Sequence, residues 1–304
     1  MAVPQPGIFA QGTRSHHHLE LDVRADATHD AIVRALRGLR EPAVTVGGSN
    51  IVVGFGADFA RRLLPGDVPS DVQPFPGVTG SAGSVPATPH DVWVWAHGTG
   101  QDVLLDVARA IGACLAPVAV LAAEQAGFVY HDSRDLTGFI DGTGNPEPDE
   151  QHDRAIIPDG SPGAGGSFCI AQRWVHDLGY FNGLSLDDQQ NTFGRTKADS
   201  TRLDNQVPTS HLSHVELRDG ETADASKPKR GEMVRRSTPY AFHDGTVGLY
   251  FMGFCREQAP LRERMEAIYG MNGQARDALT DYSTPASGSF YFAPSHESLD
   301  AMLA

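Results

Sequence analysis

Alternating apolar and polar positions predict strands in the first half of the chain, and apolar residues at helical spacing predict the helices between them. The predicted elements are, in order, a strand at 16–23, a helix after Thr28, a strand or hairpin at 44–56, a strand at 91–97, a helix at 101–115 and a strand within 116–130. The Thr28 side chain can cap the first helix, whose apolar stripe is Ile32, Val33, Leu36 and Leu39.

The second half repeats a similar order of elements. It consists of a strand at 167–175, a helix near 185–195, strands at 211–218, 232–240 and 248–256, a helix containing Leu261, Met265 and Ile268, and a strand at 287–294. This order is typical of ferredoxin-like domains, in which helices cover one face of an antiparallel sheet. The expected fold class is therefore α+β, with two ferredoxin-like domains.

Glycine and proline are concentrated in two segments that we expect to be loops, residues 65–90 and 142–166. The second segment divides the chain almost in half and is the better domain boundary. We expect an N-terminal domain of residues 1–145 and a C-terminal domain of residues 146–304.

Composition narrows the class of protein. The 304 residues are 40% hydrophobic, and 24 basic against 38 acidic residues give a net charge of −14, which repels phosphate backbones and argues against a nucleic-acid partner. No apolar run approaches the ~18 residues of a membrane span, and the N-terminus lacks a secretory signal pattern. The three cysteines lie too far apart for a C-x-x-C metal site. These features predict a cytoplasmic protein with no membrane partner.

Histidines are plentiful, and the segment HLSH at 211–214 is the first candidate site. As a strand, it places His211 on the apolar face with Val215 and Leu217, and His214 on the opposite, charged face. A zinc site built from both histidines is therefore disfavoured, and a hydrogen-bonded core histidine is the ordinary alternative for His211. The strand at 16–23 likewise points His17 inward and its two neighbouring histidines outward.

Two further segments carry polar residues in suggestive patterns. GFIDGTGNP at 138–146 is a turn sequence, and Pro146 and His152 occupy the positions where a calcium loop needs glycine and an acid. In MVRRSTPY at 233–240, strand phase places Arg235 and Ser237 on one face. Such an arginine can line an anion or peroxide pocket, although arginines on sheets more often pair with surface carboxylates.

These segments, together with GLYFMGFCR at 248–256, DYSTPASGSFYFAPS at 281–295 and the PQPGIF start, resemble in their order the dye-decolourising peroxidases. The short loops and compact length are most similar to the B-type subgroup. The resemblance implies a barrel-like pair of ferredoxin-like domains that hold haem b, mainly through the C-terminal half. It also implies a haem peroxidase that uses hydrogen peroxide to oxidise dyes, phenols or other one-electron donors through a ferryl intermediate.

The resemblance assigns roles to individual residues. His211 is implied as the proximal ligand of the haem iron, and Asp141 and Arg235 as the distal catalytic pair. Asp281 is implied as the carboxylate that accepts a hydrogen bond from the other nitrogen of His211.

Three more residues are implied to contact the haem: Gly142, Thr143 and Ser237. Ser237 stands where several relatives carry asparagine, so a direct bond from it to peroxide is in doubt. Gly144 stands where many relatives carry glutamate, so contacts with electron donors that are proposed there in relatives do not transfer to this chain.

Partners and competing functions follow from the same resemblance. We expect hydrogen peroxide and small-molecule reductants as partners, a homo-oligomer, and a preference for cationic donors because of the net charge. Trp174, Tyr180 and Tyr250 are candidates for electron transfer at the surface. A haem-delivery protein and an enzyme acting on porphyrins themselves are the alternatives, and retention of both Asp141 and Arg235 favours the peroxidase.

Overall fold

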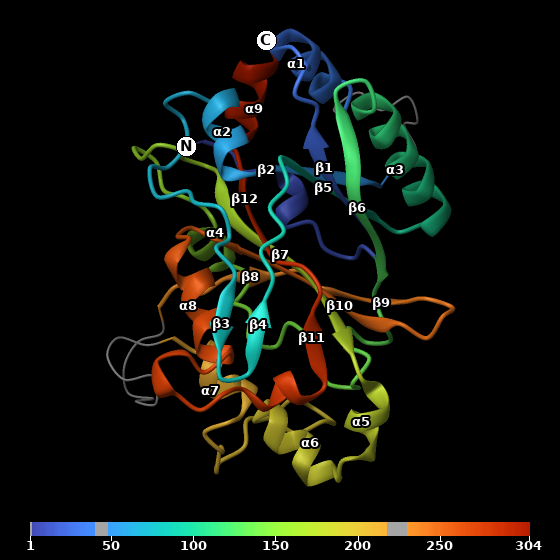
Figure 1. The fold of residues 1–304 in the computed structure, drawn as a ribbon, viewed down its shortest axis with the longest axis vertical. Coiled ribbons are helices and arrows are strands. Elements are labelled where there is room, and N and C mark those ends of the chain that lie inside the picture. Colours follow the sequence, from blue (N-terminus) through green and yellow to red (C-terminus); the bar gives the residue numbers. More distant parts are fainter. Residues whose placement is uncertain (1, 40–47, 218–229) are drawn as a thin grey trace.

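The N-terminal half of the molecule forms four strands of a large antiparallel sheet, with helices packed on it (Figure 1). The structure is a computed structural model that describes residues 2–39, 48–217 and 230–304. The elements of this half are η1 (Pro6–Ile8), β1 (Ser15–Val23), α1 (His29–Arg37), β2 (Asn50–Phe55), α2 (Ala57–Leu63), β3 (Val78–Gly80), β4 (Gly83–Val85), β5 (Val92–Gly98), α3 (Gln101–Leu115) and β6 (Ala119–Phe128).

The C-terminal half continues the same sheet and adds the helices at the lower end of Figure 1. Its elements are α4 (Gln151–Ala155), β7 (Ser167–His176), α5 (Leu178–Gly183), α6 (Leu186–Phe193), α7 (His211–Val215), β8 (Val234–Arg235), β9 (Thr238–Ala241), β10 (Val247–Cys255), α8 (Ala259–Ile268), η2 (Met271–Gly273), η3 (Ala278–Asp281), β11 (Ser283–Pro285), β12 (Ser289–Ala293) and α9 (His296–Leu303).

Both halves have the strand order of a ferredoxin-like domain. The sheet runs β6-β1-β5-β2-β12-β7-β10-β8, so in each half the first strand lies between the last and the third. Among the described residues, the pairing of Phe55 with Phe292 joins β2 of the first half to β12 of the second. The predicted α+β class with two ferredoxin-like units is confirmed, whereas the boundary between residues 145 and 146 stays a prediction.

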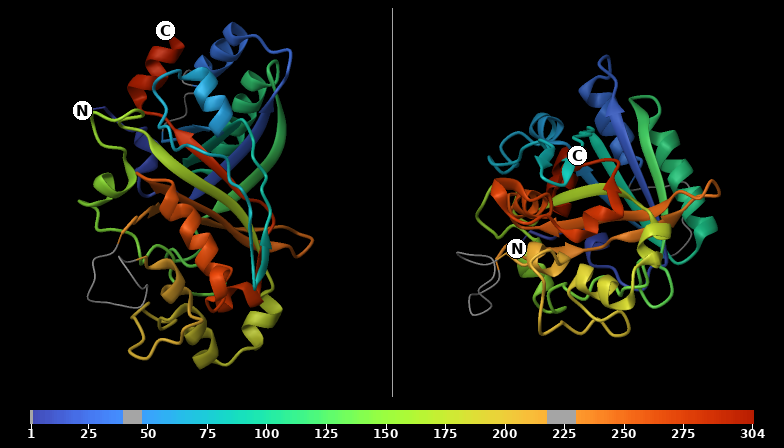
Figure 2. Two further views of the ribbon diagram at one scale, coloured as in Figure 1. Left: turned by 60° about the vertical axis from the view of Figure 1, so that its left-hand side comes forward. Right: turned by 60° about the horizontal axis from the view of Figure 1, so that its bottom comes forward.

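The sheet is nearly closed into a barrel. Strand β9 pairs with β10 and closely approaches β6, where a Cβ on Gly127 would come 2.4 Å from the Thr238 hydroxyl. The left view of Figure 2 shows the strong twist of the strands, with α5 and α6 at the end of the molecule opposite α9. No helix within the described ranges is long and apolar enough to cross a membrane.

Most of the predicted elements form where their patterns indicate. The Thr28 hydroxyl accepts a hydrogen bond from the Ala31 amide, which caps α1 as predicted, and Ile32 and Leu36 are buried on its inner face. Helix α3 has the predicted bounds, 101–115. The expected strand or hairpin at 44–56 is described only from residue 48, and β2 forms within that part.

The strand predicted at 211–218 is wrong, because this segment begins with the short helix α7. His214 is buried, and its ring nitrogens lie 2.8 and 2.7 Å from the carbonyl oxygens of Ser210 and Ala275. His211 is the more exposed of the two histidines. The assignment of faces by strand phase was therefore also wrong, because alternation over five residues does not distinguish a strand from one turn of helix.

The prediction for the histidines of β1 was only partly right: His17 is buried as predicted, but His16 and His18 do not point to solvent. His16, His17 and His18 are all buried, because the closed sheet covers the inner face of β1 and neighbouring side chains cover the outer one. His16 and His97 stack with ring centroids 5.5 Å apart. The Arg236 guanidinium lies 5.2 Å from the ring of Trp95, which stacks on His97.

This buried cluster predicts that the protein loses stability in acid. Burial, with Arg236 nearby, lowers the pKa of His16 to about 4, and burial lowers the pKa of His97 to about 3. Unfolded histidine titrates near ~6.5, so the unfolded chain binds these protons first and stability falls as the pH drops below that value. For each of these histidines, the free energy of unfolding falls by about 2 kcal/mol when the pH is lowered from about 8 to about 5.

Urea unfolding of wild type and His97→Gln at both pH values measures this cost. The variant should lose about 2 kcal/mol less than wild type on acidification, and the exposed-site control His29→Gln should match wild type. Equal losses in all three proteins would contradict the account.

Candidate active site

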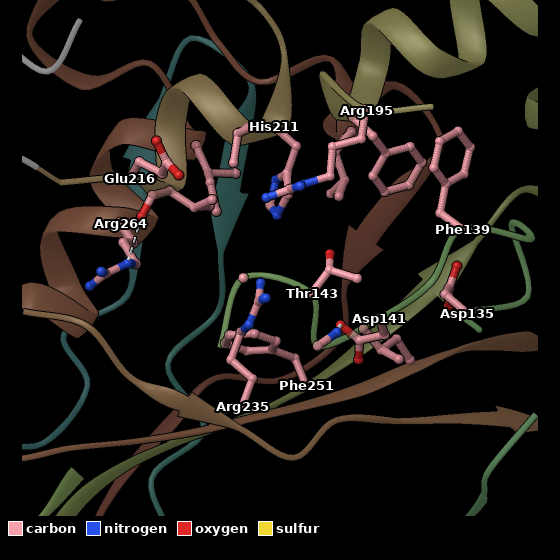
Figure 3. A pocket seen from close by; sticks show the side chains of 18 of the residues that line it. Asp135, Phe139, Asp141, Thr143, Arg195, His211, Glu216, Arg235, Phe251 and Arg264 are labelled. Atoms are coloured by element: carbon pink, nitrogen blue, oxygen red, sulfur yellow. Dashed lines mark hydrogen bonds between the residues drawn. The ribbon is translucent and has the colours of Figure 1, made fainter. Parts of the chain in front are cut away.

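A deep cavity lies between α7, the loop at residues 139–144, and strands β8 and β10. The centre of a water molecule can occupy about 190 Å³ of it. Figure 3 shows His211 on one side of the cavity and Asp141, Arg235 and Phe251 on the other. The structure therefore brings the predicted histidine, carboxylate and guanidinium to one site, from segments far apart in the sequence.

His211 is the first residue of α7, and its ring points into the cavity (Figure 3). Its Nδ1 lies 2.6 Å from Oδ2 of Asp277, whose side chain is fully buried. The other carboxylate oxygen of Asp277 accepts a hydrogen bond from the Leu279 amide. This arrangement fixes the carboxylate and makes Nδ1 the protonated nitrogen, so Nε2 is the one that can bind a metal ion.

Asp281 does not have the role that the sequence implied. It pairs with Arg276, their nearest atoms 2.5 Å apart, whereas Asp277, four residues earlier, holds His211. The cause is the short helix η3, which Asp277 caps and in which Asp281 is the last residue. One turn of helix separates the two carboxylates, and only the first reaches α7.

Asp141 lies across the cavity from His211, at the turn after Ile140. Its amide donates to the Ser133 carbonyl, and its Oδ1 accepts a hydrogen bond of 2.7 Å from the Gly142 amide. Gly142 has φ +81°, a left-handed conformation that glycine adopts without strain. Burial raises the pKa of Asp141, and the Arg235 charge opposes this rise.

Arg235 is held by the side chain of Asn145. The Arg235 amide donates to Asn145 Oδ1 at 2.9 Å, and Asn145 Nδ2 donates to the Arg235 carbonyl at 3.0 Å. A Cβ on Gly144 would lie 2.9 Å from Arg235 Nη2. The glycine therefore leaves room for the guanidinium, which a side chain at this position would displace.

The remaining predicted contacts divide into two groups. Gly142 and Thr143 line the cavity, and the Thr143 hydroxyl bonds to that of Ser200 at 3.0 Å. Ser237 is absent from the cavity lining in the described structure, and its hydroxyl accepts from the Met252 amide at 3.3 Å. The predicted strand at 232–240 breaks between β8 and β9, just before Ser237, and the contact of Ser237 with the haem stays a prediction.

The rest of the lining is largely apolar, with cations at several points. The apolar side chains include Phe193, Leu212, Val215, Met233, Leu249, Phe251, Met265, Ile268 and Leu279. Arg195 lies on the lining, with Nη1 bonded to the Ser200 carbonyl at 2.8 Å. Such a cavity suits a large flat apolar group that carries anionic substituents.

Sequence reasoning missed Asp277 and Asn145. Asn145 lies four residues after Asp141, which could have marked it as part of the site, but nothing in the sequence paired it with Arg235.

Of the aromatic residues expected at the surface, Tyr180 is exposed, whereas Trp174 and Tyr250 are buried. Within the described ranges, no cluster of three or more histidine, cysteine or acidic side chains could hold a metal ion.

Comparison with protein families gives two matches that together span most of the chain. Residues 5–129 match the model described as Dyp-type peroxidase, N-terminal, and residues 132–298 match Dyp-type peroxidase, C-terminal.

Individual relatives agree with these matches. A dye-decolorizing peroxidase from Mycobacterium tuberculosis is 31% identical over 98% of this chain and 90% of its own length. One from Rhodococcus erythropolis is 30% identical over 92% of this chain and 80% of its own. A DypB variant from Rhodococcus jostii RHA1, solved in complex with heme, has a TM-score of 0.89 at 28% identity, and covers 99% of each chain. A dye-decolorizing protein from V. cholerae has a TM-score of 0.87 at 29% identity, and covers 98% of each chain.

Proposed function

The chain belongs to the Dyp-type peroxidase family, and from that premise we propose that His211 and Asp277 hold its haem while Asp141 and Arg235 act on peroxide. The protein is a haem peroxidase that uses hydrogen peroxide to oxidise one-electron donors such as dyes and phenols. The observation that carries the assignment of residues is the cavity itself, which has a carboxylate-bound imidazole on one side and a carboxylate and guanidinium on the other.

The residues of the cavity fit haem b. Nε2 of His211 lies on a mainly apolar lining and is free to bind a metal, as a haem ligand requires, whereas both ring nitrogens of the nearby His176 are engaged by Asp135 and Ser283. Arg195 can pair with the anionic carboxylates at the porphyrin edge, with Gly142 and Thr143 on the lining nearby. When bound, haem would supply an iron that can coordinate peroxide and the two electrons needed to cleave the O–O bond.

Asp277 controls how strongly His211 donates electron density to a metal ion bound at Nε2. A buried carboxylate at 2.6 Å from Nδ1 draws the Nδ1 proton toward itself and increases the electron density on Nε2. A more basic Nε2 favours the oxidised states of a bound iron. The Leu279 amide keeps this carboxylate in place.

Asp141 moves the proton. Oδ1 is engaged by the Gly142 amide, so Oδ2 is the oxygen that takes a proton from hydrogen peroxide. The same oxygen then returns that proton to the departing peroxide oxygen, which leaves as water. Because burial raises the pKa of Asp141, the ionised base is lost at a pH above the ~3.9 of an ordinary aspartate.

Arg235 stabilises negative charge as the O–O bond breaks, since its guanidinium is preorganised at the cavity wall. Asn145 fixes the Arg235 main chain from both sides. Gly144 leaves the space that the guanidinium occupies. Asn145 is thus a positioning residue for Arg235.

We also propose the B-type subgroup, a domain boundary at residues 145 and 146, a cytoplasmic location and a homo-oligomer. The long edge strand β6 supports the last of these, because it exposes Val120, Leu121 and Phe128. The net charge of −14 favours cationic reductants at low ionic strength.

Replacing His211 tests the ligand assignment. His211→Ala should abolish stable haem retention, because His176, the other imidazole on the described lining, has both ring nitrogens engaged by Asp135 and Ser283. The ratio of Soret to protein absorbance after purification measures retention, and circular dichroism verifies folding. The control His214→Gln should keep its haem, because His214 bonds to main-chain carbonyls away from the cavity. Retention by a folded His211→Ala protein would refute the assignment.

The two catalytic residues can be ranked. Arg235→Ala should slow the first absorbance change after mixing with peroxide more than Asp141→Ala does. The reason is that water can replace a buried base, whereas nothing replaces the preorganised charge. Stopped-flow absorbance of both variants measures this, and Asn145→Ala should fall between wild type and Arg235→Ala. Equal or reversed losses would contradict the ranking.

A further inference from the structure

The cavity opens to the surface beside Thr143 and Gly144, which are the exposed members of its described lining. The segment that leads from α6 toward α7 lies across this mouth, and we call its residues 194–203 the strap. Figure 3 shows the Thr143 side chain pointing toward the side of the cavity that carries Arg195, a residue of the strap. A ligand that enters the cavity at this mouth must therefore pass between Thr143 and the strap.

A hydrogen bond between two side chains joins the strap to the opposite wall of the cavity. The hydroxyls of Thr143 and Ser200 lie 3.0 Å apart. Thr143 is exposed and Ser200 is buried, so the bond lies at the boundary between the mouth and the cavity. It connects the loop that carries Asp141 with the segment that leads to His211, and these are the two sides between which the haem is proposed to lie.

Arg134 provides a second connection, at the tip of the strap. Its Nη1 donates to the Lys197 carbonyl at 2.8 Å, and its Nη2 donates to the Ala198 carbonyl at 3.0 Å. The main chain of Arg134 also forms an antiparallel β-bridge with Ile140, the residue directly before Asp141. One arginine therefore holds both the tip of the strap and the loop that carries the proposed catalytic carboxylate.

The strap is a compact loop that is anchored on its own side of the mouth. The Leu203 amide donates to the Gly194 carbonyl at 3.0 Å, which brings the two ends of the loop together. Lys197 ties the loop to α6, because its amide donates to Gln190 Oε1 at 3.1 Å and its Nζ donates to Gln189 Oε1 at 2.7 Å. The strap can therefore separate from Thr143 and Arg134 without losing these bonds.

Ser200 is held in an unfavourable backbone conformation. Its φ of +62° is in the left-handed region, which residues other than glycine rarely adopt. Such a conformation persists only where the surroundings enforce it, and it is common at ligand clamps. The Ser200 carbonyl accepts a hydrogen bond from Arg195 Nη1 at 2.8 Å. The strained residue therefore joins Thr143 through its side chain to Arg195 through its main chain.

We propose that the strap is the gate of the haem site, held closed by the Thr143–Ser200 hydrogen bond and by Arg134. This inference rests on the proposed function. The strap must open before haem can enter or leave, so these two connections set the rates of capture and release. They are the same in the loaded and the empty protein, and for this reason they change both rates by the same factor and leave the affinity to His211 and the apolar lining. Ser200 and Arg134 are thus positioning residues of the strap.

Haem transfer rates test the gate. Release is measured by mixing the haem-loaded protein with excess apomyoglobin, and capture by mixing the haem-free protein with monomeric haem, both followed at the Soret band. Thr143→Val and Ser200→Ala should each raise both rates by roughly fivefold, the factor that corresponds to one ordinary hydrogen bond. The double variant should match either single variant, because the two hydroxyls share one bond. The control Thr79→Val, at an exposed position of β3, should match wild type.

Arg134→Met, which removes two bonds to the strap, should raise both rates further. Circular dichroism verifies folding, and if this variant does not fold, Ser200→Ala, which removes a single oxygen atom, decides the result. Unchanged rates, a rise in release without a rise in capture, or additive effects in the double variant would overturn the gate while the peroxidase stands. A folded wild-type protein that captures no haem would instead refute the proposed function, and the gate with it.

Discussion

The hydrogen bond between His211 Nδ1 and Asp277 is the interaction on which the active site depends. It determines which imidazole nitrogen faces the cavity, and it connects α7 to the segment after α8, so the orientation of the ring follows from the packing of the C-terminal half. Asp277 is itself fixed, because it caps η3 and is fully buried. Without this bond, the imidazole would sit on a helix of five residues that has little internal support.

A second constraint is the near closure of the sheet. It gives β10 one face toward the cavity, with Leu249 and Phe251, and one buried face toward the interior, with Tyr250 and Met252. Neighbouring residues therefore lie in different environments. Arg235 faces the peroxide site, whereas Arg236 lies within the barrel and its Nη1 donates to the Ile8 carbonyl at 2.8 Å. The same closure buries the histidines of β1 and brings the tyrosines of β10 and β12 to one carboxylate. The acid sensitivity is thus a consequence of this architecture.

The sequence predicted most of the fold, because strands and long helices leave a periodic pattern. It placed α3 at its observed bounds, and the family resemblance pointed to His211, Asp141 and Arg235, which line one cavity. It failed where the answer depends on tertiary contacts. The turn of helix at α7 is too short to show a period, and the choice of Asp277 over Asp281 depends on where η3 begins. The break between β8 and β9 could not be read from the pattern, and the burial of His16 and His18 was missed because burial on both faces cannot be inferred from one strand.

Resonance Raman spectroscopy of the ferrous, haem-loaded protein tests the central interaction most directly, because the iron–imidazole stretching frequency reports how strongly Nδ1 is bonded to its partner. The account predicts a band at the high frequency typical of an imidazole with a carboxylate partner. This band should shift down in Asp277→Asn and stay in place in Asp281→Asn. A band that does not respond to Asp277→Asn, or that shifts only in Asp281→Asn, would contradict the account.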